Sequence, residues 1–253
     1  GKIVLLSQRA LSFDRIKAED DRPVKFANAY IDYMLDRIVD PDAGIYTAIV
    51  APFQRPRAAA ELIDRVGGER GVVGVLMITA GPEPPLGHHR YNPMYEAAQD
   101  AGLPMIFHAG GPSLDHFYVR GYERLIETHT LAFPWNNMAQ LTSLLVQGVP
   151  VKYPDIDFVF QESGIYWVPM MMQRLDAEYM KRQSEAPMLE KRPSKYMKEF
   201  YFGTQPLEQP ENEDELEQIV DMIGGPERLM YASDYPHWDY DPPSVIENRS
   251  FLS

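Results

Sequence analysis

Residues 102–111 read Gly102-Leu103-Pro104-Met105-Ile106-Phe107-His108-Ala109-Gly110-Gly111. The glycine and proline at the start end the preceding helix, and the apolar run that follows predicts a strand buried on both faces. A histidine stands where this strand ends, and the small residues after it let a ligand approach the backbone. The segment therefore predicts the repeating unit of a parallel α/β protein, in which a helix leads into a buried strand with a polar residue at its carboxyl end.

The same pattern repeats on both sides of this segment. Short β-rich runs predict strands at Ile3–Ser7, Tyr46–Pro52, Val72–Ile78, Pro104–His108, Ile156–Gln161, Phe200–Gly203 and Arg228–Ser233. Apolar residues at helical spacing between them predict helices at Lys25–Val39, Arg57–Val66, Pro93–Ala101, Asn137–Gln147, Trp167–Lys181 and Asp214–Ile223. This alternation is typical of a parallel sheet with crossover helices.

The number of strands favours one architecture. Seven strands are one fewer than close a (β/α)8 TIM barrel, whose usual size is about 250 residues. We therefore predict a single barrel domain over residues 1–253, which lacks its first strand and last helix in the chain as given. The missing strand is expected before Gly1 and the missing helix after Ser253. An open doubly wound sheet is the alternative, but no Gly-x-Gly-x-x-Gly follows any predicted strand.

Composition excludes several classes of function. The net charge is −13 and the chain contains no cysteine. Without a basic run, nucleic-acid binding is not expected, and no apolar stretch reaches the roughly 18 to 20 residues of a membrane span. The first residues do not resemble a signal peptide, so we expect a cytoplasmic enzyme. Any metal ion would have to be held by histidine and carboxylate side chains.

Polar side chains end three of the predicted strands. His108 ends one strand, Glu162 follows another, and Asp234 follows the last, with His237 three residues further on. In a barrel the carboxyl ends of the strands meet at one rim, where the chemistry takes place. One histidine and two carboxylates suit a divalent cation such as Zn²⁺ or Mn²⁺. A catalytic zinc takes three protein ligands and a water, so these residues do not complete a site.

Three segments together carry a resemblance to a known family. They are Phe107-His108-Ala109-Gly110, the stretch from Tyr153-Pro154-Asp155 through Glu162-Ser163-Gly164-Ile165-Tyr166-Trp167-Val168-Pro169 to Arg174-Leu175-Asp176, and Ser233-Asp234-Tyr235-Pro236-His237. In order and spacing they resemble the amidohydrolase superfamily. Within it, they are similar to the branch that includes aminocarboxymuconate-semialdehyde decarboxylase and related aromatic-acid decarboxylases.

The resemblance implies a metal-dependent barrel. In this family a His-x-His pair on the first strand, a histidine on the fifth and an aspartate on the eighth bind one divalent metal ion, for which zinc is our first expectation and manganese the second. His108 and Asp234 match the last two ligands, whereas the chain contains no His-x-His. Glu162 stands where many members have a histidine on the sixth strand. It can ligate the metal or accept a proton, or it could simply pair with an arginine such as Arg174.

Five further residues are candidates for binding a substrate. His237 could orient the site or bind substrate, or it could be a packing residue beside Trp238. His129 could reach the substrate from a loop. Trp135, Phe133 and Tyr166 could line an apolar pocket for a ring, although aromatic residues pack in protein cores more often than they bind ligands.

We interpret the chain as a metal-dependent hydrolase of a small cyclic or aromatic substrate, with Asp234 and Glu162 as catalytic residues. The reason for favouring hydrolysis is that Glu162, as a second anion beside Asp234, would repel a carboxylate substrate and favour deprotonation of water. A non-oxidative decarboxylase of an aromatic or unsaturated acid is the alternative, and a metal-free binding module is a third possibility. The resemblance also leads us to expect a homodimer or a higher homo-oligomer.

Overall fold

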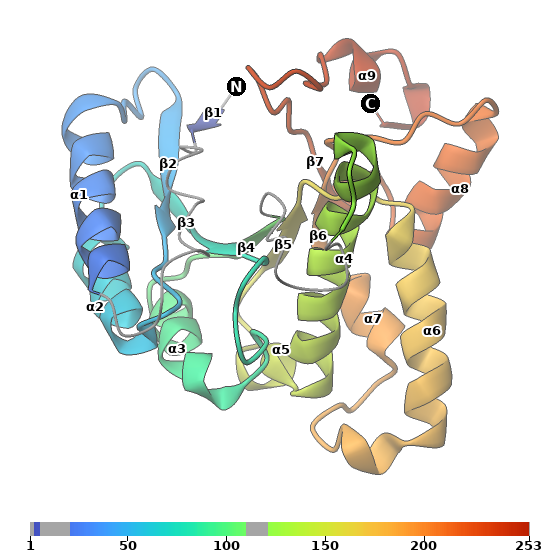
Figure 1. Cartoon of the computed structure of the whole chain (residues 1–253), viewed down its shortest axis with the longest axis horizontal. Helices are drawn as coiled ribbons and strands as arrows, with labels where there is room; N and C mark the ends of the chain where they lie inside the picture. The colour runs from blue at the N-terminus through green and yellow to red at the C-terminus, as the bar shows by residue number, and fades with distance from the viewer. Residues whose placement is uncertain (1–2, 6–20, 110–120, 253) are drawn as a thin grey trace.

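The computed structural model describes residues 3–5, 21–109 and 121–252, and the fold in these residues is a parallel α/β arrangement (Figure 1). Seven strands form one sheet in the order β1-β2-β3-β4-β5-β6-β7, and every neighbouring pair is parallel. Their bounds are Ile3–Leu5, Ile45–Val50, Val72–Ile78, Met105–His108, Phe158–Gln161, Tyr201–Gly203 and Leu229–Met230. Strands that follow one another in the chain are therefore also neighbours in the sheet, as in a (β/α)8 barrel.

Helices cover the outside of the curled sheet (Figure 1). The α-helices are α1 Arg22–Arg37, α2 Pro56–Val66, α3 Asn92–Asp100, α4 Leu125–Val146, α5 Val149–Lys152, α6 Trp167–Lys181, α7 Pro193–Met197, α8 Glu213–Ile223 and α9 Ser244–Glu247. Short 3₁₀ turns lie at His89–Tyr91, Gln183–Glu185, Pro226–Arg228 and Ser250–Leu252. None of the helices in the described residues is long and apolar enough to cross a membrane.

The strands and the six predicted helices occur where the sequence predicts them, and α4 differs most in its bounds. It begins at Leu125, twelve residues before the predicted start at Asn137, and it contains Pro134 in its interior. Proline removes a backbone donor and is unfavourable inside a helix, so sequence pattern alone predicts only the second half of α4. Packing against the ends of the strands outweighs this local preference, as the contacts of α4 described below show.

Closure of the barrel is not shown by the described residues. No strand ladder joins β7 to β1 there, so the sheet is open between these two strands. The expected strand before Gly1 and helix after Ser253 are outside the chain, and Gly110 and Gly111, expected to border the ligand, lie outside the described residues.

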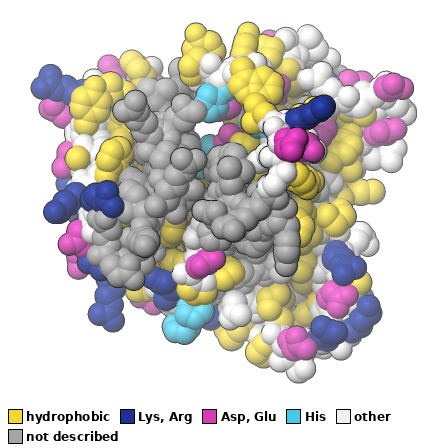
Figure 2. Space-filling model, viewed as in Figure 1, with side chains coloured by type: hydrophobic (Ala, Val, Ile, Leu, Met, Phe, Trp, Pro, Cys, Tyr) yellow, Lys and Arg dark blue, Asp and Glu magenta, His cyan; other side chains and the backbone are white. Residues whose placement is uncertain are grey.

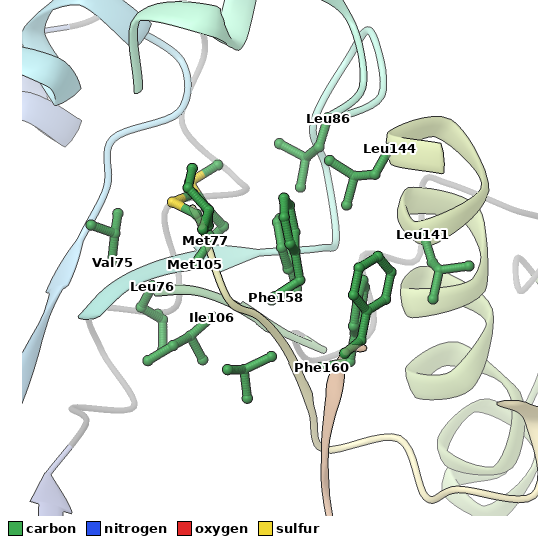
Figure 3. Close-up of a cluster of buried hydrophobic side chains, with 14 of the residues drawn as sticks. Val75, Leu76, Met77, Leu86, Met105, Ile106, Leu141, Leu144, Phe158 and Phe160 are labelled. Atoms are coloured by element: carbon green, nitrogen blue, oxygen red, sulfur yellow. The ribbon is translucent and has the colours of Figure 1, made fainter. Parts of the chain in front are cut away.

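Side chains of the central strands alternate between two apolar environments. Register pairs Leu76 with Ile106 and places His108 opposite Ile78, so these four side chains share one face of the sheet. The opposite face packs against the helices. Figure 3 shows Phe158 and Phe160 on that face, near Leu86 and the α4 residues Leu141 and Leu144, whereas Leu76 and Ile106 point the other way. His108 therefore projects from the face of the sheet that carries Leu76 and Ile106, away from the helices.

Helix α4 also binds the loop between β3 and α3 through polar contacts. Gln140 accepts a hydrogen bond from the backbone N–H of Leu86 at 2.7 Å and donates one to the carbonyl of Thr79 at 3.1 Å. The N–H of Gly87 donates to Ser143 Oγ at 3.1 Å. At Gly87 the backbone is so close to α4 that a Cβ would lie 2.1 Å from the carbonyl oxygen of Ser143. Only glycine fits at this position.

We expect Gly87→Ala to lower the free energy of unfolding by about 1–3 kcal/mol, because the new methyl group overlaps backbone atoms that cannot move independently of α4. Chemical denaturation followed by circular dichroism measures this change. Gly68→Ala is the matched control, since a Cβ at Gly68 would have no neighbour within 4 Å. Equal stability of the two variants would show that the loop does not depend on this close approach.

Candidate functional site

Three strands deliver polar side chains to the same edge of the sheet. His108 is the last residue of β4, Glu162 follows β5 directly, and Asp234 lies four residues after β7. Because all strands are parallel, these positions are at carboxyl ends, which is where α/β barrels carry their active sites. Figure 2 shows histidine and acidic side chains beside a hollow in one face of the molecule, while most lysines and arginines lie at its periphery.

Glu162, Asp234 and His237 form a cluster that could hold a metal ion. Each offers a ligand atom, and these atoms lie within 4.8 Å of one another. His237 Nδ1 is 2.5 Å from Asp234 Oδ2, so the cluster is already connected by a short hydrogen bond. Two carboxylates and an imidazole are suitable donors for Mn²⁺ or Zn²⁺. The residues present therefore fit a divalent cation.

His108 lies beside this cluster and is connected to it through Glu162. Its Nδ1 is 2.8 Å from Glu162 Oε2 and 2.9 Å from the carbonyl oxygen of Ala109. Neither contact uses Nε2. A histidine that binds metal commonly donates its other ring N–H to a carboxylate or a backbone carbonyl, as this arrangement allows His108 to do.

The charges of these groups influence one another. Burial alone would lower the pKa of His108, but the charge and hydrogen bond of Glu162, the carbonyl of Ala109 and the charge of Asp234 together outweigh it, so this pKa is raised. Burial also raises the pKa of Asp234, and the negative charge of Glu162 adds to this effect against the opposing hydrogen bond from His237. Asp234 is consequently better able to carry a proton than an exposed aspartate.

Two residues of the site have an unusual backbone conformation. Glu162 has φ of 60° and Asp234 has φ of 55°, and they are the only residues other than glycine with positive φ in the described residues. Such conformations cost free energy and persist where the surrounding structure enforces them, which is frequently at functional sites.

Side chains from other elements fix the turn that carries Glu162. The buried amide of Asn137, on α4, donates to the carbonyl of Gln161 at 2.9 Å and to Ser163 Oγ at 2.8 Å, on either side of Glu162. Further along the same turn, the two carboxylate oxygens of Glu208 accept hydrogen bonds from the N–H groups of residues 165 and 166, at 3.0 and 3.2 Å. The turn is held at both ends, which explains how it maintains a strained residue.

A pocket of about 380 Å³ adjoins the cluster. Its lining combines apolar and aromatic side chains with acidic and amide groups, and Glu162 belongs to both the pocket and the cluster. The lining residues are His129, Thr130, Phe133, Pro134, Glu162, Ser163, Gly164, Trp167, Gln205, Pro206, Leu207, Glu208 and Asp239. A small ring compound could therefore reach the cluster from this pocket.

The predicted substrate-binding residues do not all lie at the cluster or the pocket. His237 is in the cluster, and His129 lines the pocket with its Nε2 3.4 Å from Asp239 Oδ2. His129 is on α4 and not on a loop, so the predicted location was wrong, because α4 starts earlier than its sequence pattern indicates. Trp135 and Tyr166 are not among the residues that line the pocket.

Several residues of the site are not indicated by the sequence. Trp167 supplies an aromatic wall, and Asp239 and Glu208 supply carboxylates. Phe133, which the sequence does indicate as a possible pocket residue, is the other aromatic wall. Glu208 belongs to an acidic run whose pattern indicates a solvated segment, and nothing in the sequence places it next to the turn after β5. Glu162 pairs with His108, so the alternative pairing with Arg174 is wrong.

Comparison with solved structures finds the same fold in several decarboxylases. The 5-carboxyvanillate decarboxylase of Sphingomonas paucimobilis is 21% identical, with a TM-score of 0.75 over 100% of this chain and 72% of that chain. A dihydroxybenzoic acid decarboxylase from Polaromonas sp. JS666, with bound manganese and the inhibitor 2-nitroresorcinol, is 20% identical. Its TM-score is 0.67, over 88% of this chain and 67% of that chain. A 5-carboxyvanillate decarboxylase from Novosphingobium aromaticivorans, with manganese and 3-methoxy-4-hydroxy-5-nitrobenzoic acid, is 19% identical. Its TM-score is 0.71, over 95% of this chain and 68% of that chain.

These neighbours contradict the prediction of a hydrolase. Five of the similar structures are named as decarboxylases and two only as amidohydrolases, so the decarboxylase alternative is the better supported. The prediction of hydrolysis requires Glu162 to be a free anion. In the structure its carboxylate is instead paired with His108, with 2.8 Å between Glu162 Oε2 and His108 Nδ1.

The sequence as a whole matches a family model. No curated protein matches the chain significantly. The amidohydrolase family model, however, matches residues 7–249, which is nearly the whole chain and includes all the residues of the cluster. The chain therefore belongs to the amidohydrolase family.

Proposed function

We propose that this protein is a metal-dependent, non-oxidative decarboxylase of an aromatic carboxylic acid. The observation that carries the proposal is the Glu162, Asp234 and His237 cluster beside a pocket with aromatic walls. The decarboxylases of the same fold support it, and two of them contain manganese.

The cluster residues, together with Nε2 of His108, would hold the ion. A divalent cation there would supply the positive charge that attracts the carboxylate of the substrate. Manganese is the ion named in the neighbours, and zinc is the other candidate for these donors.

The chain's own residues account for orientation and proton transfer. Phe133 and Trp167 form apolar walls against which an aromatic ring can lie. In the reaction the bond between the ring carbon and the carboxylate breaks, CO₂ leaves, and the electron pair left on the ring carbon takes up a proton. Asp234, which belongs to the cluster, can deliver that proton from a carboxyl oxygen. His237, hydrogen-bonded to Asp234 Oδ2, fixes the orientation of this group.

We also propose that the complete fold is a single closed (β/α)8 barrel. The sequential order of the seven parallel strands supports this, since an eighth strand between β7 and β1 would close the sheet. Such a strand would place additional ligands beside the cluster.

A metal-dependence experiment tests the proposed function. The full chain is treated with a chelator, dialysed, and assayed for CO₂ release from 2,6-dihydroxybenzoate and related hydroxybenzoates with and without added Mn²⁺ or Zn²⁺. We expect no release without metal and restored release with it, because the carboxylate cluster alone cannot attract an anionic substrate. Neutral esters and lactones serve as the control panel. Hydrolysis of that panel, with no CO₂ from any aromatic acid, would overturn the proposal.

A further inference from the structure

The pocket beside the cluster has further acidic groups in its lining. Glu208 and Asp239 both line it, and no lysine or arginine does so within the part of the chain that the structure describes. Among the described residues, the only lining side chain that could carry positive charge is His129, whose Nε2 is 3.4 Å from Asp239 Oδ2. A ligand that fills the pocket therefore meets two carboxylates with at most one cation to compensate for them.

Both carboxylates are held in place by the protein. Glu208 accepts two backbone hydrogen bonds at the turn after β5. Gly164 in that turn leaves room for it, because a Cβ there would lie 2.2 Å from Glu208 Oε1. Asp239 is also largely buried, with 19% of its side chain exposed. Partly buried charges in a pocket interact more strongly with a charged ligand than fully exposed charges do, since solvent screens them less.

This arrangement distinguishes two classes of aromatic acid. In a monocarboxylate, the one negative group can be taken by the metal cluster, and the rest of the ring can present hydroxyl or amino groups as donors to the carboxylates. In a dicarboxylate, the second negative group would enter the pocket that Glu208 and Asp239 line. Repulsion between this second carboxylate and the two acidic side chains lowers the affinity of the pocket for the dicarboxylate and so favours the monocarboxylate.

We propose that Glu208 and Asp239 are specificity-determining residues that restrict the substrate to aromatic monocarboxylates with hydrogen-bond donors on the ring and exclude acids with a second carboxylate. The inference rests on the proposed decarboxylase function and deepens it. It selects substrates of the dihydroxybenzoate type over those of the carboxyvanillate type.

A matched pair of probes tests the inference without catalysis. One is 3-methoxy-4-hydroxy-5-nitrobenzoic acid, whose nitro group stands in for the reacting carboxylate and which carries a second, intact carboxylate. The other is 2-methoxy-6-nitrophenol, which is the same molecule without that carboxylate. Binding of each to the manganese-loaded full chain is measured by titration calorimetry. We expect the phenol to bind about tenfold more tightly or better, and we expect the ratio to fall as salt concentration rises.

Variants locate the effect in the pocket. Asp239→Asn should bring the ratio of the two affinities towards one, and Glu208→Gln should act in the same direction. Asp221→Asn, which removes an exposed charge on α8, is the matched control and should leave the ratio unchanged. The salt dependence of the unmodified chain tests the same idea should a variant fail to fold.

The outcomes separate this inference from the proposed function. Equal or tighter binding of the probe that carries the carboxylate would overturn the inference and leave the decarboxylase proposal intact. Failure of both probes to bind the manganese-loaded protein would instead overturn the proposed function, and the inference with it.

Discussion

Asp234→Asn is expected to abolish most of the decarboxylase activity, with kcat reduced about 10³-fold or more, because the change removes both a metal ligand and the proton donor. The fold should survive. Asparagine is one of the few residues that tolerate positive φ, so it can adopt the backbone conformation of Asp234, whose φ is 55°. Its amide oxygen can also still accept the hydrogen bond from His237.

Three measurements on the same sample check this prediction. CO₂ release gives the activity, elemental analysis gives the metal content, and circular dichroism gives the fold. Asp221→Asn, which is exposed on α8, controls for the loss of one negative charge. Full metal content together with activity near that of the unmodified protein would show that Asp234 is neither ligand nor acid.

Much of the fold was predictable because each strand is a short apolar run. Parallel strands covered on both faces, such as Val72–Ile78 and Met105–His108, are continuous apolar runs. Their short length distinguishes them from the longer helical patterns. The N-terminal half of α4 was not predictable, since Pro134 disfavours a helix locally and the compensation comes from distant contacts. Asn137 and Gln140 bind the ends of β5 and β3, and such contacts cannot be inferred from spacing along the chain.

The site was predictable only in part for a related reason. Strand ends are visible in the sequence, so the apolar runs alone indicate His108, Glu162 and Asp234 as candidates. The positive φ angles of Glu162 and Asp234 are not visible, because neither residue is a glycine. Asp239 lines the pocket because the chain after β7 returns to α4, where Asp239 contacts His129. The sequence does not show this return. The prediction of hydrolysis treated Glu162 as an unpaired anion. Its pairing with His108 cannot be inferred from the sequence.

The role of that pairing can be isolated at Glu162. Glu162→Gln keeps the length of the side chain and places no new demand on the backbone, since neither residue is branched at Cβ. It replaces the charged acceptor of His108 Nδ1, which is 2.8 Å away, with a neutral and weaker amide oxygen, and the carbonyl of Ala109 remains. Loss of a carboxylate that orients a metal-binding histidine typically costs about 10- to 100-fold in metal affinity or activity. Because Glu162 is also in the cluster itself, we expect a loss of about 10²-fold in kcat and a weaker metal site.

Comparison with Glu162→Asp separates charge from reach. Aspartate retains the negative charge and tolerates positive φ better than glutamate, but it is one methylene shorter and should not reach His108. If Glu162 acts by orienting His108, both variants lose activity, and nitrogen NMR shows the ring of His108 no longer held in one tautomer. If it acts as a ligand through its charge, aspartate retains more metal than glutamine. Activity of Glu162→Gln equal to that of the unmodified chain would contradict both roles. The contact with His108 would then only help to hold β4 and β5 together, and the strained turn fixed by Asn137 and Glu208 would lack a catalytic reason.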